Sequence, residues 1–172
     1  MAKVGIYGGS FNPIHFGHIG LAEWIVTHTD LDEVWLLVSP NNPLKDTAIL
    51  ADENQRLAAA QAAVAGKTGL RVSDFEFHLP RPSYTANTLR ALSEAYPEHE
   101  FTLIIGEDNL RIFDKWREYT YILSHYRVFV YPRRGYQVDE IPYHGDIVLL
   151  SGAPYFDISS TEIREKFAGT KK

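Results

Sequence analysis

Residues 4–18 read Val-Gly-Ile-Tyr-Gly-Gly-Ser-Phe-Asn-Pro-Ile-His-Phe-Gly-His, an apolar run followed by a loop rich in glycine and histidine. The run, Val4–Tyr7, is typical of a buried strand. Beyond the loop, apolar residues recur on the same helix face as His18: Leu21, Ala22, Ile25 and Val26. The stretch therefore predicts a strand, a loop and a helix that begins near Gly17.

The same order of elements continues along the chain. Five more short apolar runs predict strands: Val34–Val38, Leu70–Ser73, Phe101–Ile105, Arg127–Tyr131 and Ile147–Leu150. Between them, residues 52–65 form an Ala-rich helical pattern that opens with Asp52 and Gln55 at capping-box spacing and stops at Gly66. Another pattern is closed by Pro97 and marked by Leu89, Leu92 and Tyr96. This alternation predicts an α/β fold, a parallel sheet with helices on both faces and ligands beyond the carboxyl ends of the strands.

The composition describes a folded chain of ordinary domain size. It has 172 residues, of which 45% are hydrophobic and 23% charged, and it contains no cysteine. We expect one domain over residues 1–172, because two domains would leave each half near the lower limit for an independent core. The lack of cysteine excludes disulfides, thiolate metal sites and a cysteine nucleophile.

Charge and hydropathy limit the partners. The net charge of −5 argues against a broad surface for duplex nucleic acid or RNA. A membrane-spanning helix needs about 18 apolar residues or more, and the sequence contains no such run. The start, Met1–Ile6, passes into the first strand without the apolar core of a signal peptide. We therefore expect a cytoplasmic protein with neither nucleic acid nor membrane as a partner, and the sequence leaves its oligomeric state open.

The loop of residues 8–18 combines features that suit a phosphate group. Gly8 and Gly9 let the backbone approach a ligand closely, and the next helix offers free N–H groups and the positive end of its dipole. The imidazoles of His15 and His18 lie in the same space. The loop has neither the GxGxxG pattern nor the Gly-Lys-Ser/Thr of a P-loop, so it is a different kind of phosphate site.

Each histidine also has an ordinary interpretation. Alone, His15 could be a satisfied loop residue and His18 a helix residue packed on the apolar face. A zinc site is a third interpretation, but a histidine pair at i, i+3 has no third ligand nearby in the sequence. The two histidines together favour anion binding.

Residues 158–164, Ile-Ser-Ser-Thr-Glu-Ile-Arg, predict a helix N-terminus near the end of the chain. Ser159 and Glu162 have capping-box spacing, and Ile158 and Ile163 have the spacing of a hydrophobic staple. By itself this is a well-formed helix start. The stretch would also form a second anion cradle through free amides and the side chains of Ser160, Thr161 and Arg164.

These two stretches resemble the GGSFNPxHxGH and ISSTxIR motifs of the HxGH nucleotidyltransferase superfamily. The resemblance implies a single-domain, Rossmann-like nucleotidyltransferase fold and ATP as a substrate. In that superfamily the histidines hold the triphosphate and the second one reaches the phosphorus under attack, which implies these roles for His15 and His18. The second motif binds the β- and γ-phosphates, which implies that role for residues 158–161 and Arg164.

Three stretches between the motifs resemble elements of the nicotinate mononucleotide adenylyltransferases. Asn41–Lys45 stands at the family's PPHK element, whose lysine contacts phosphate, with Leu44 in place of the usual histidine. Ser83–Leu89 is similar to SYTxDTL, with Asn87 in place of the aspartate. Ile105–Leu110 is similar to the IGxDxL turn, whose aspartate borders the nucleotide pocket.

Beyond that turn, Trp116 matches the family tryptophan that lies against the nicotinate ring, and a planar aromatic face suits a pyridinium. The resemblance is weakest at the arginines of residues 133–135, which could be solvated or could face the nucleotide. Without the motifs, the same stretches have structural interpretations: Lys45 as a surface residue, Ser83 and Thr85 as helix caps, Asp108 as an N-cap and Trp116 as a core residue.

The resemblance thus implies transfer of AMP from ATP to nicotinate mononucleotide, releasing pyrophosphate, with Mg²⁺ carried on the ATP phosphates and no metal ligand in the protein. It implies ATP contacts from Gly8, Gly9, Ser10, Phe11, Lys45, Gly106, Asp108, Ile158, Ser159, Ser160 and Thr161. It implies acceptor contacts from Asn12, Tyr84, Thr85, Trp116 and Arg117. Nicotinamide mononucleotide, phosphopantetheine and glycerol phosphate are the alternative acceptors, and a non-catalytic nucleotide sensor or an RNA-binding module are the alternatives outside enzymes.

Overall fold

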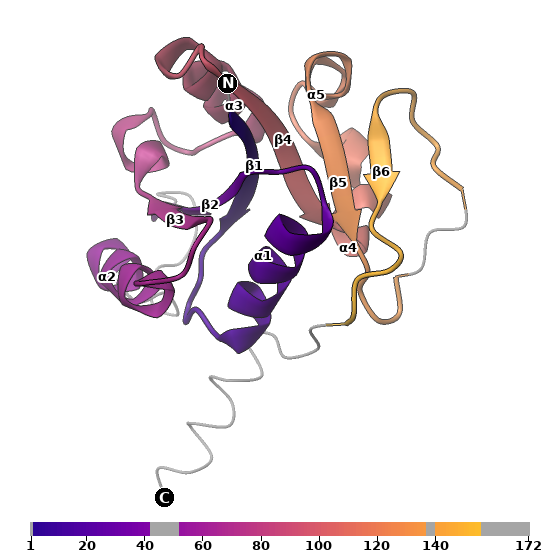
Figure 1. Cartoon of the computed structure of the whole chain (residues 1–172). Helices are drawn as coiled ribbons and strands as arrows, with labels where there is room; N and C mark the ends of the chain where they lie inside the picture. The colour runs from indigo at the N-terminus through magenta and orange to yellow at the C-terminus, as the bar shows by residue number, and fades with distance from the viewer. Residues whose placement is uncertain (1, 42–51, 137–139, 156–172) are drawn as a thin grey trace, which may run out of the picture.

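The computed structural model describes residues 2–41, 52–136 and 140–155. Their centre is one six-stranded sheet in the order β3-β2-β1-β4-β5-β6 (Figure 1). All neighbouring strands are parallel. The strands are β1 (Ala2–Gly9), β2 (Glu33–Val38), β3 (Leu70–Ser73), β4 (His99–Gly106), β5 (Arg127–Tyr131) and β6 (Ile147–Leu149). The order reverses between β1 and β4, so the carboxyl ends of these two strands diverge into a crevice.

Helices cover both faces of the sheet (Figure 1). The buried apolar side chains of α1 (Phe16–His28) and α2 (Glu53–Val64) belong to the apolar cluster on one face. The other face carries α3 (Thr85–Ala95), α4 (Glu107–Arg111) and α5 (Tyr119–His125). Two short 3₁₀ turns, η2 (Phe75–His78) and η3 (Phe113–Lys115), lie beside α3 and α4 in sequence.

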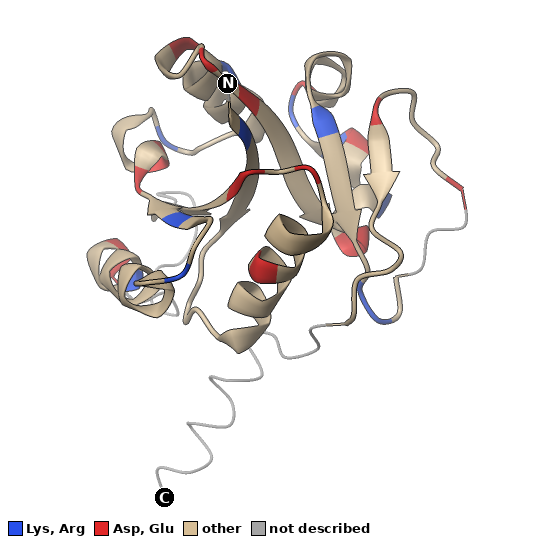
Figure 2. Ribbon diagram, in the orientation of Figure 1, with Lys and Arg blue, Asp and Glu red and all other residues tan. Residues whose placement is uncertain are grey.

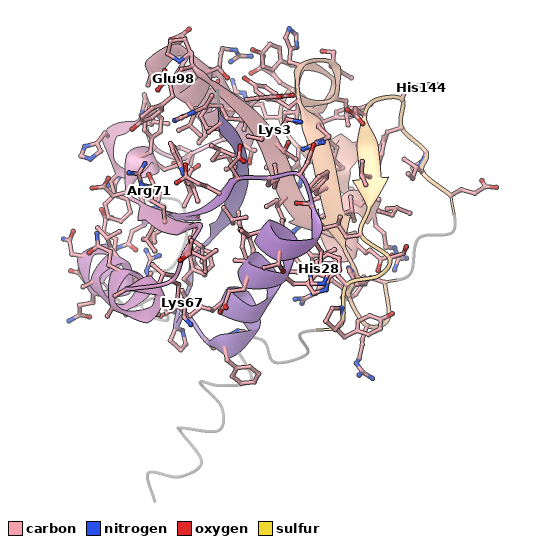
Figure 3. The ribbon with its side chains drawn as sticks, in the orientation of Figure 1. Lys3, His28, Lys67, Arg71, Glu98 and His144 are labelled. Atoms are coloured by element: carbon pink, nitrogen blue, oxygen red, sulfur yellow. The ribbon has the colours of Figure 1, made fainter. Side chains whose placement is uncertain are left out.

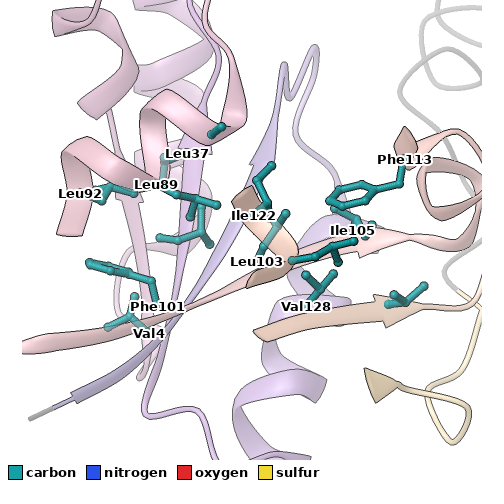
Figure 4. Packing of buried hydrophobic residues seen from close by; sticks show 14 of the residues in the cluster. Val4, Leu37, Leu89, Leu92, Phe101, Leu103, Ile105, Phe113, Ile122 and Val128 are labelled. Carbon is teal, nitrogen blue, oxygen red and sulfur yellow. The ribbon is translucent and has the colours of Figure 1, made fainter. Parts of the chain in front are cut away.

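The pleat of the strands divides the core in two. In β1, Val4 and Ile6 belong to the cluster beneath α3 and α5, whereas Tyr7 belongs to the cluster beneath α1 and α2. Figure 4 shows the first cluster, with Leu89 of α3 over the sheet and Phe113 fully buried. Because each central strand is buried on both faces, it reads as a continuous apolar run, which is why these strands could be predicted from the sequence.

The predicted strands are confirmed, with bounds that match the predictions or differ by one or two residues at an end. β1 runs on to Gly9, which pairs with Val38, and its other end pairs Ala2 with His99. The predicted helices over 52–65 and before Pro97 are also confirmed, as α2 and α3.

The helix ends differ from the predictions in detail. Asp52 does cap α2, but its side chain accepts a hydrogen bond from the amide of Asn54. Gly66, just past the end of α2, has φ +78°, a conformation that favours glycine. The prediction that Ser83 or Thr85 caps α3 is wrong: the N-cap is Tyr84, without a side-chain hydrogen bond, because the backbone stays extended through that residue.

Charges of both signs are mixed over the described ribbon (Figure 2). At the amino end of the sheet, Asp30 accepts from Lys3 at 3.1 Å and from the two terminal nitrogens of Arg127 at 2.8 and 3.0 Å, and Figure 3 shows Lys3 on its strand. This cluster joins β1 and β5 to the loop after α1. In the described part of the chain, no helix combines the length and the apolarity that crossing a membrane requires.

Candidate active site

A cavity of about 870 Å³ lies at the carboxyl ends of the strands. Its walls include Tyr7, Gly8 and Gly9 from the end of β1, Leu37 from β2, Ile104 and Ile105 from β4 and Tyr131 from β5. It therefore occupies the crevice where the strand order reverses, the place at which open α/β sheets bind their ligands.

The two histidines of the loop after β1 form the N-terminal cap of α1. His15 is the N-cap, and its Nδ1 accepts a hydrogen bond from the amide of Gly17 at 3.0 Å. In return, the Nδ1 of His18 accepts from the amide of His15 at 3.1 Å, and the two rings stack with centroids 3.8 Å apart. Because each Nδ1 is an acceptor, each neutral ring carries its proton on Nε2 and can donate from there. The sequence predicted both histidines near a helix start but not this reciprocal cap.

His18 is uncharged at neutral pH in the free protein. Its pKa is lowered from 6.5 to about 3, first by burial and then by the neighbouring His15 and by Arg133. Its ring packs edge-to-face with that of Phe11, with centroids 4.9 Å apart. In this state His18 is a hydrogen-bond donor and not a cation.

The glycines beside the cavity make room for a ligand. A side chain on Gly8 would meet nothing within 4 Å, so this position is open, and both Gly8 and Ser10 line the cavity. Below them, Phe11 is 2% exposed with φ +48°, and its ring lies 3.3 Å from where a Cβ on Gly9 would stand. Asn12 follows, also buried. Phe11 thus supports the loop from the core side.

Arg56 of α2 is a site residue that the sequence did not single out. It is 3% exposed, lines the cavity, and its Nη1 donates to the carbonyls of Ser10 at 2.7 Å and Ser39 at 2.8 Å. Its Nη2 donates to the side-chain oxygen of Asn41 at 2.9 Å. Arg56 therefore joins the loop after β1 to the loop after β2. One signal was present: the buried residues of α2 are Arg56, Ala60 and Val64, so this arginine stands on the apolar stripe of its helix.

The opposite wall contains part of the predicted acceptor site. Thr85, at the start of α3, and Trp116 both line the cavity. Trp116 also packs on Phe113, with centroids 4.9 Å apart, so the core interpretation and the cavity interpretation both hold. Beside them, Arg117 lies over the ring of Tyr84 at 4.6 Å.

Three more residues of that wall were not predicted as site residues: Glu76, Ser83 and Thr88. The hydroxyl of Thr88 donates to Glu76 at 2.7 Å. The Oγ of Ser83 is buried and has no hydrogen-bond partner among the described residues. The signal of Ser83 in the sequence is weak, because a short polar residue at a helix start is equally typical of a cap.

The end of β4 is closely packed. A Cβ on Gly106 would lie 2.5 Å from a carboxylate oxygen of Asp108 and 2.9 Å from the ring of Tyr131, so only glycine fits there. Gly106 is itself the N-cap of α4, so the interpretation of Asp108 as N-cap is wrong. Arg133 approaches Asp108 at 3.8 Å, and its amide donates to Glu107 at 3.0 Å. Arg133 thus folds back onto α4.

Several predicted site residues lie outside the described part of the chain: Lys45, Ile158, Ser159, Ser160, Thr161 and Arg164. The predicted convergence of the two helix starts on one nucleotide therefore stays a prediction. Among the residues that the structure describes, no group of three His, Cys, Asp or Glu side chains is placed to hold a metal ion.

Comparison with known proteins assigns this arrangement to a family. The model of the cytidylyltransferase-like family matches residues 6–166. A probable nicotinate-nucleotide adenylyltransferase of Bacteroides fragilis is 50% identical over 98% of this chain and 84% of its own. One of Flavobacterium johnsoniae is 46% identical over 94% of this chain and 84% of its own.

Solved structures share the fold. Plasmodium falciparum nicotinic acid mononucleotide adenylyltransferase complexed with NaAD superposes with a TM-score of 0.79 at 20% identity, covering 96% of this chain and 83% of that one. A putative nicotinate-nucleotide adenylyltransferase from Vibrio parahaemolyticus superposes with a TM-score of 0.71 at 25% identity, covering 100% and 84%. The parallel α/β architecture predicted from the sequence is confirmed.

Proposed function

This chain belongs to the cytidylyltransferase-like family, and from that membership we infer that it has nicotinate-nucleotide adenylyltransferase activity. Such an enzyme transfers AMP from ATP to nicotinate mononucleotide, giving nicotinate adenine dinucleotide and pyrophosphate, a step of NAD biosynthesis. The observation that carries this conclusion is 50% identity to a relative of that name over 98% of the chain. The cavity at the strand ends is the site to which the two nucleotides are assigned.

ATP is proposed to bind along the loop after β1. Gly8 is open to the cavity, Ser10 lines it, and the N-terminus of α1 follows with its free N–H groups. The Nε2–H of His18 would donate to a phosphate oxygen, and the motif implies a phosphate contact for His15 as well. Lys45 and residues 158–164 would complete the phosphate site, as the motifs imply.

Nicotinate mononucleotide is proposed to bind against the opposite wall. Trp116 offers a flat aromatic face for the pyridinium ring. The ring carboxylate suits the start of α3 at Thr85, where no side chain caps the helix and the dipole is positive. The acceptor phosphate would then lie toward Gly8 and the ATP.

The proposed reaction needs alignment and charge neutralisation more than proton transfer. An oxygen of the acceptor phosphate forms a bond to the α-phosphorus of ATP, and the bond from that phosphorus to the bridging oxygen breaks, so pyrophosphate leaves with the electron pair. The attacking phosphate is already an anion at neutral pH, so no general base is required. His18, neutral in the free protein, would donate a hydrogen bond to the phosphate where charge develops.

Mg²⁺ is proposed to enter with ATP as part of that substrate. Mg²⁺ keeps several waters and is commonly held by one or two carboxylates together with substrate phosphates. Activity should therefore stop when the ion is chelated and return when Mg²⁺ is added.

The cytoplasm is the proposed compartment. Both substrates are polyanions, and charged groups do not leave water for the interior of a bilayer without a large cost. The enzyme must then work in the compartment that holds both nucleotides. Fractionation of the source cells, followed by the activity assay on each fraction, tests this location.

One assay tests the function directly: pyrophosphate release from Mg-ATP with each acceptor in turn. We expect release with nicotinate mononucleotide and less with nicotinamide mononucleotide. Release with phosphopantetheine or glycerol phosphate alone would contradict the acceptor, and a protein that binds ATP without release would be a sensor.

A further inference from the structure

Glu76 is an acidic residue inside the cavity for which the proposed reaction has no use. It lies on η2 and lines the same cavity as Thr85 and Trp116. Its Oε2 accepts a hydrogen bond from the hydroxyl of Thr88 at 2.7 Å, one helical turn beyond Thr85. A carboxyl group is therefore held close to the place where the ring of the acceptor is proposed to bind.

The surroundings of Glu76 favour its neutral form. Burial raises its pKa above the usual 4.5, and the hydrogen bond from Thr88 opposes this rise. An ionised Glu76 would repel a second carboxylate placed in the same cavity, whereas a protonated one can donate a hydrogen bond to it.

The charged groups on the elements around Glu76 are largely engaged with one another. On η2 itself, His78 lies 3.4 Å from Asp74. Arg81 forms an ion pair with Glu53 at 2.6 Å, and Arg90 of α3 forms one with Glu118 at 2.9 Å. Arg56 of α2 donates to the carbonyls of Ser10 and Ser39. On β2, the ionisable residue is Glu33, at the end of the strand remote from the cavity. Among the described groups, burial and Thr88 account for the state of Glu76.

We propose that Glu76 is a specificity-determining residue that selects between nicotinate and nicotinamide mononucleotide through its own proton. As a carboxylic acid it donates to the ring carboxylate of nicotinate, using the oxygen that Thr88 does not bind. As a carboxylate it repels that group and accepts instead from the amide of nicotinamide. This inference rests on the proposed function and adds to it a residue and a pH dependence of substrate choice.

The test is the ratio of kcat/KM for nicotinate mononucleotide to kcat/KM for nicotinamide mononucleotide, measured with Mg-ATP as pH is varied. Both acceptors carry the same phosphate and use the same ATP, so titration of those groups cancels in the ratio. As the pH rises, the ratio of the wild type should fall about tenfold or more as Glu76 loses its proton. Glu76→Gln, which stays neutral and can still accept from Thr88, should give a ratio independent of pH.

Two further variants complete the design. Glu94→Gln makes the same chemical change on the exposed side of α3, and its ratio should follow that of the wild type. Thr88→Val removes the hydrogen bond that lowers the pKa of Glu76, so the fall in the ratio should move to higher pH. If Glu76→Gln does not fold, the inference is tested by the direction in which Thr88→Val shifts the pH at which the ratio falls.

The outcomes separate this inference from the proposed function. A wild-type ratio that is flat with pH overturns the inference, and so does a Glu76→Gln ratio that falls like the wild type or a Thr88→Val ratio that shifts to lower pH. A wild type that forms no dinucleotide from either acceptor at any pH overturns the function itself.

Discussion

His15 and His18 close the start of α1 with their own ring nitrogens. Each Nδ1 accepts a backbone amide, which leaves each Nε2 as a donor. The cap therefore sets the tautomer and the orientation of both rings before any ligand arrives, and preorganised donors of this kind are what charge stabilisation at a reacting phosphate requires.

The protonation state of His18 is a testable consequence of its burial. In the free protein its pKa is lowered from 6.5 to about 3. NMR of the ring should show a neutral Nε2–H tautomer throughout about pH 5 to 7. A non-hydrolysable ATP analogue should move the ring signals toward the protonated form, because a nearby anion favours the charged ring. A His18 that titrates near 6.5 without ligand would contradict this.

Replacement of His18 by alanine tests its role in catalysis. We expect kcat to fall by about 10²–10³, the usual effect of removing one donor to a developing charge. Loss of the hydrogen bond to the amide of His15 should also cost about 1 kcal/mol of stability. The control is His28→Ala, at the other end of α1, where the exposed ring stacks on Trp24.

A normal kcat in His18→Ala would exclude His18 from the mechanism. Urea denaturation of both variants separates a catalytic loss from unfolding. His18→Ala should remain folded under assay conditions and still lose most of its kcat, whereas His28→Ala should keep its kcat.

At the scale of elements, the shape of the cavity depends on the loops that follow the strands. Contacts from another element hold two of these loops in place. Arg56 joins two of these loops by donating to the carbonyls of Ser10 and Ser39 and to Asn41. Arg56 belongs to α2, which lies on one face of the sheet (Figure 1). A side chain of α2 thus holds the loop after β1, which borders the crevice.

Replacement of Arg56 by methionine should destabilise the protein and loosen the ATP side of the cavity. The buried carbonyls of Ser10 and Ser39 would lose a charged donor, at a cost of about 3 kcal/mol in the free energy of unfolding. The KM for ATP should also rise, because the loops on the ATP side of the cavity would be less firmly held. Arg71→Met is the matched control, because Arg71 is exposed and rests on the ring of Trp35 at 5.4 Å; Figure 3 shows it near the edge of the sheet.

Urea denaturation and steady-state kinetics on both variants check this prediction. Equal losses of stability in Arg56→Met and Arg71→Met would show that the contacts of Arg56 do not hold the loops.

At the scale of the whole molecule, ionisable groups at opposite ends of the sheet set its response to acid. Asp30, at the amino end, has its pKa lowered from 3.8 to about 2, first by hydrogen bonding to Arg127 and also by Lys3. His18 lies near the carboxyl end. Both groups bind fewer protons in the folded chain than in the unfolded one, so both make the folded state less stable as the pH falls.

Stability should therefore be lost in two ranges of pH. The contribution of His18 is complete above pH 6.5 and is lost as the pH falls toward about 3. That of Asp30 is complete above pH 3.8 and is lost toward about 2. Since the side chain of Asp30 is 44% exposed, its contribution is worth about 1 kcal/mol or less and should weaken in salt.

Urea midpoints as a function of pH check both ranges. His18→Ala should flatten the curve in the upper range and Asp30→Asn in the lower range. A wild-type midpoint that stays constant from about pH 7 to about pH 4 would contradict the assignment to His18.

The sequence by itself determined the elements and the general place of the site. Six apolar runs predicted six strands because a parallel strand buried on both faces must be apolar along its length. Gly8, Gly9 and the two histidines predicted a phosphate loop because they are neighbours in the chain and act at short range. Trp116 and Thr85 were expected in the site only because the stretches that contain them resemble motifs of the adenylyltransferase family.

Only the tertiary structure identified the residues that join segments distant in the sequence. Arg56 reaches a carbonyl 46 residues away, and Glu76 meets Thr88 across 12 residues. The local sequence gives little sign of their importance, since an arginine in a helix and a glutamate in a turn are most often solvated. The sheet order brings such groups to one cavity, and burial there changes their pKa values and their hydrogen bonding. A periodicity reports which side of an element is buried, but the partners of a buried polar group are set by how the elements pack.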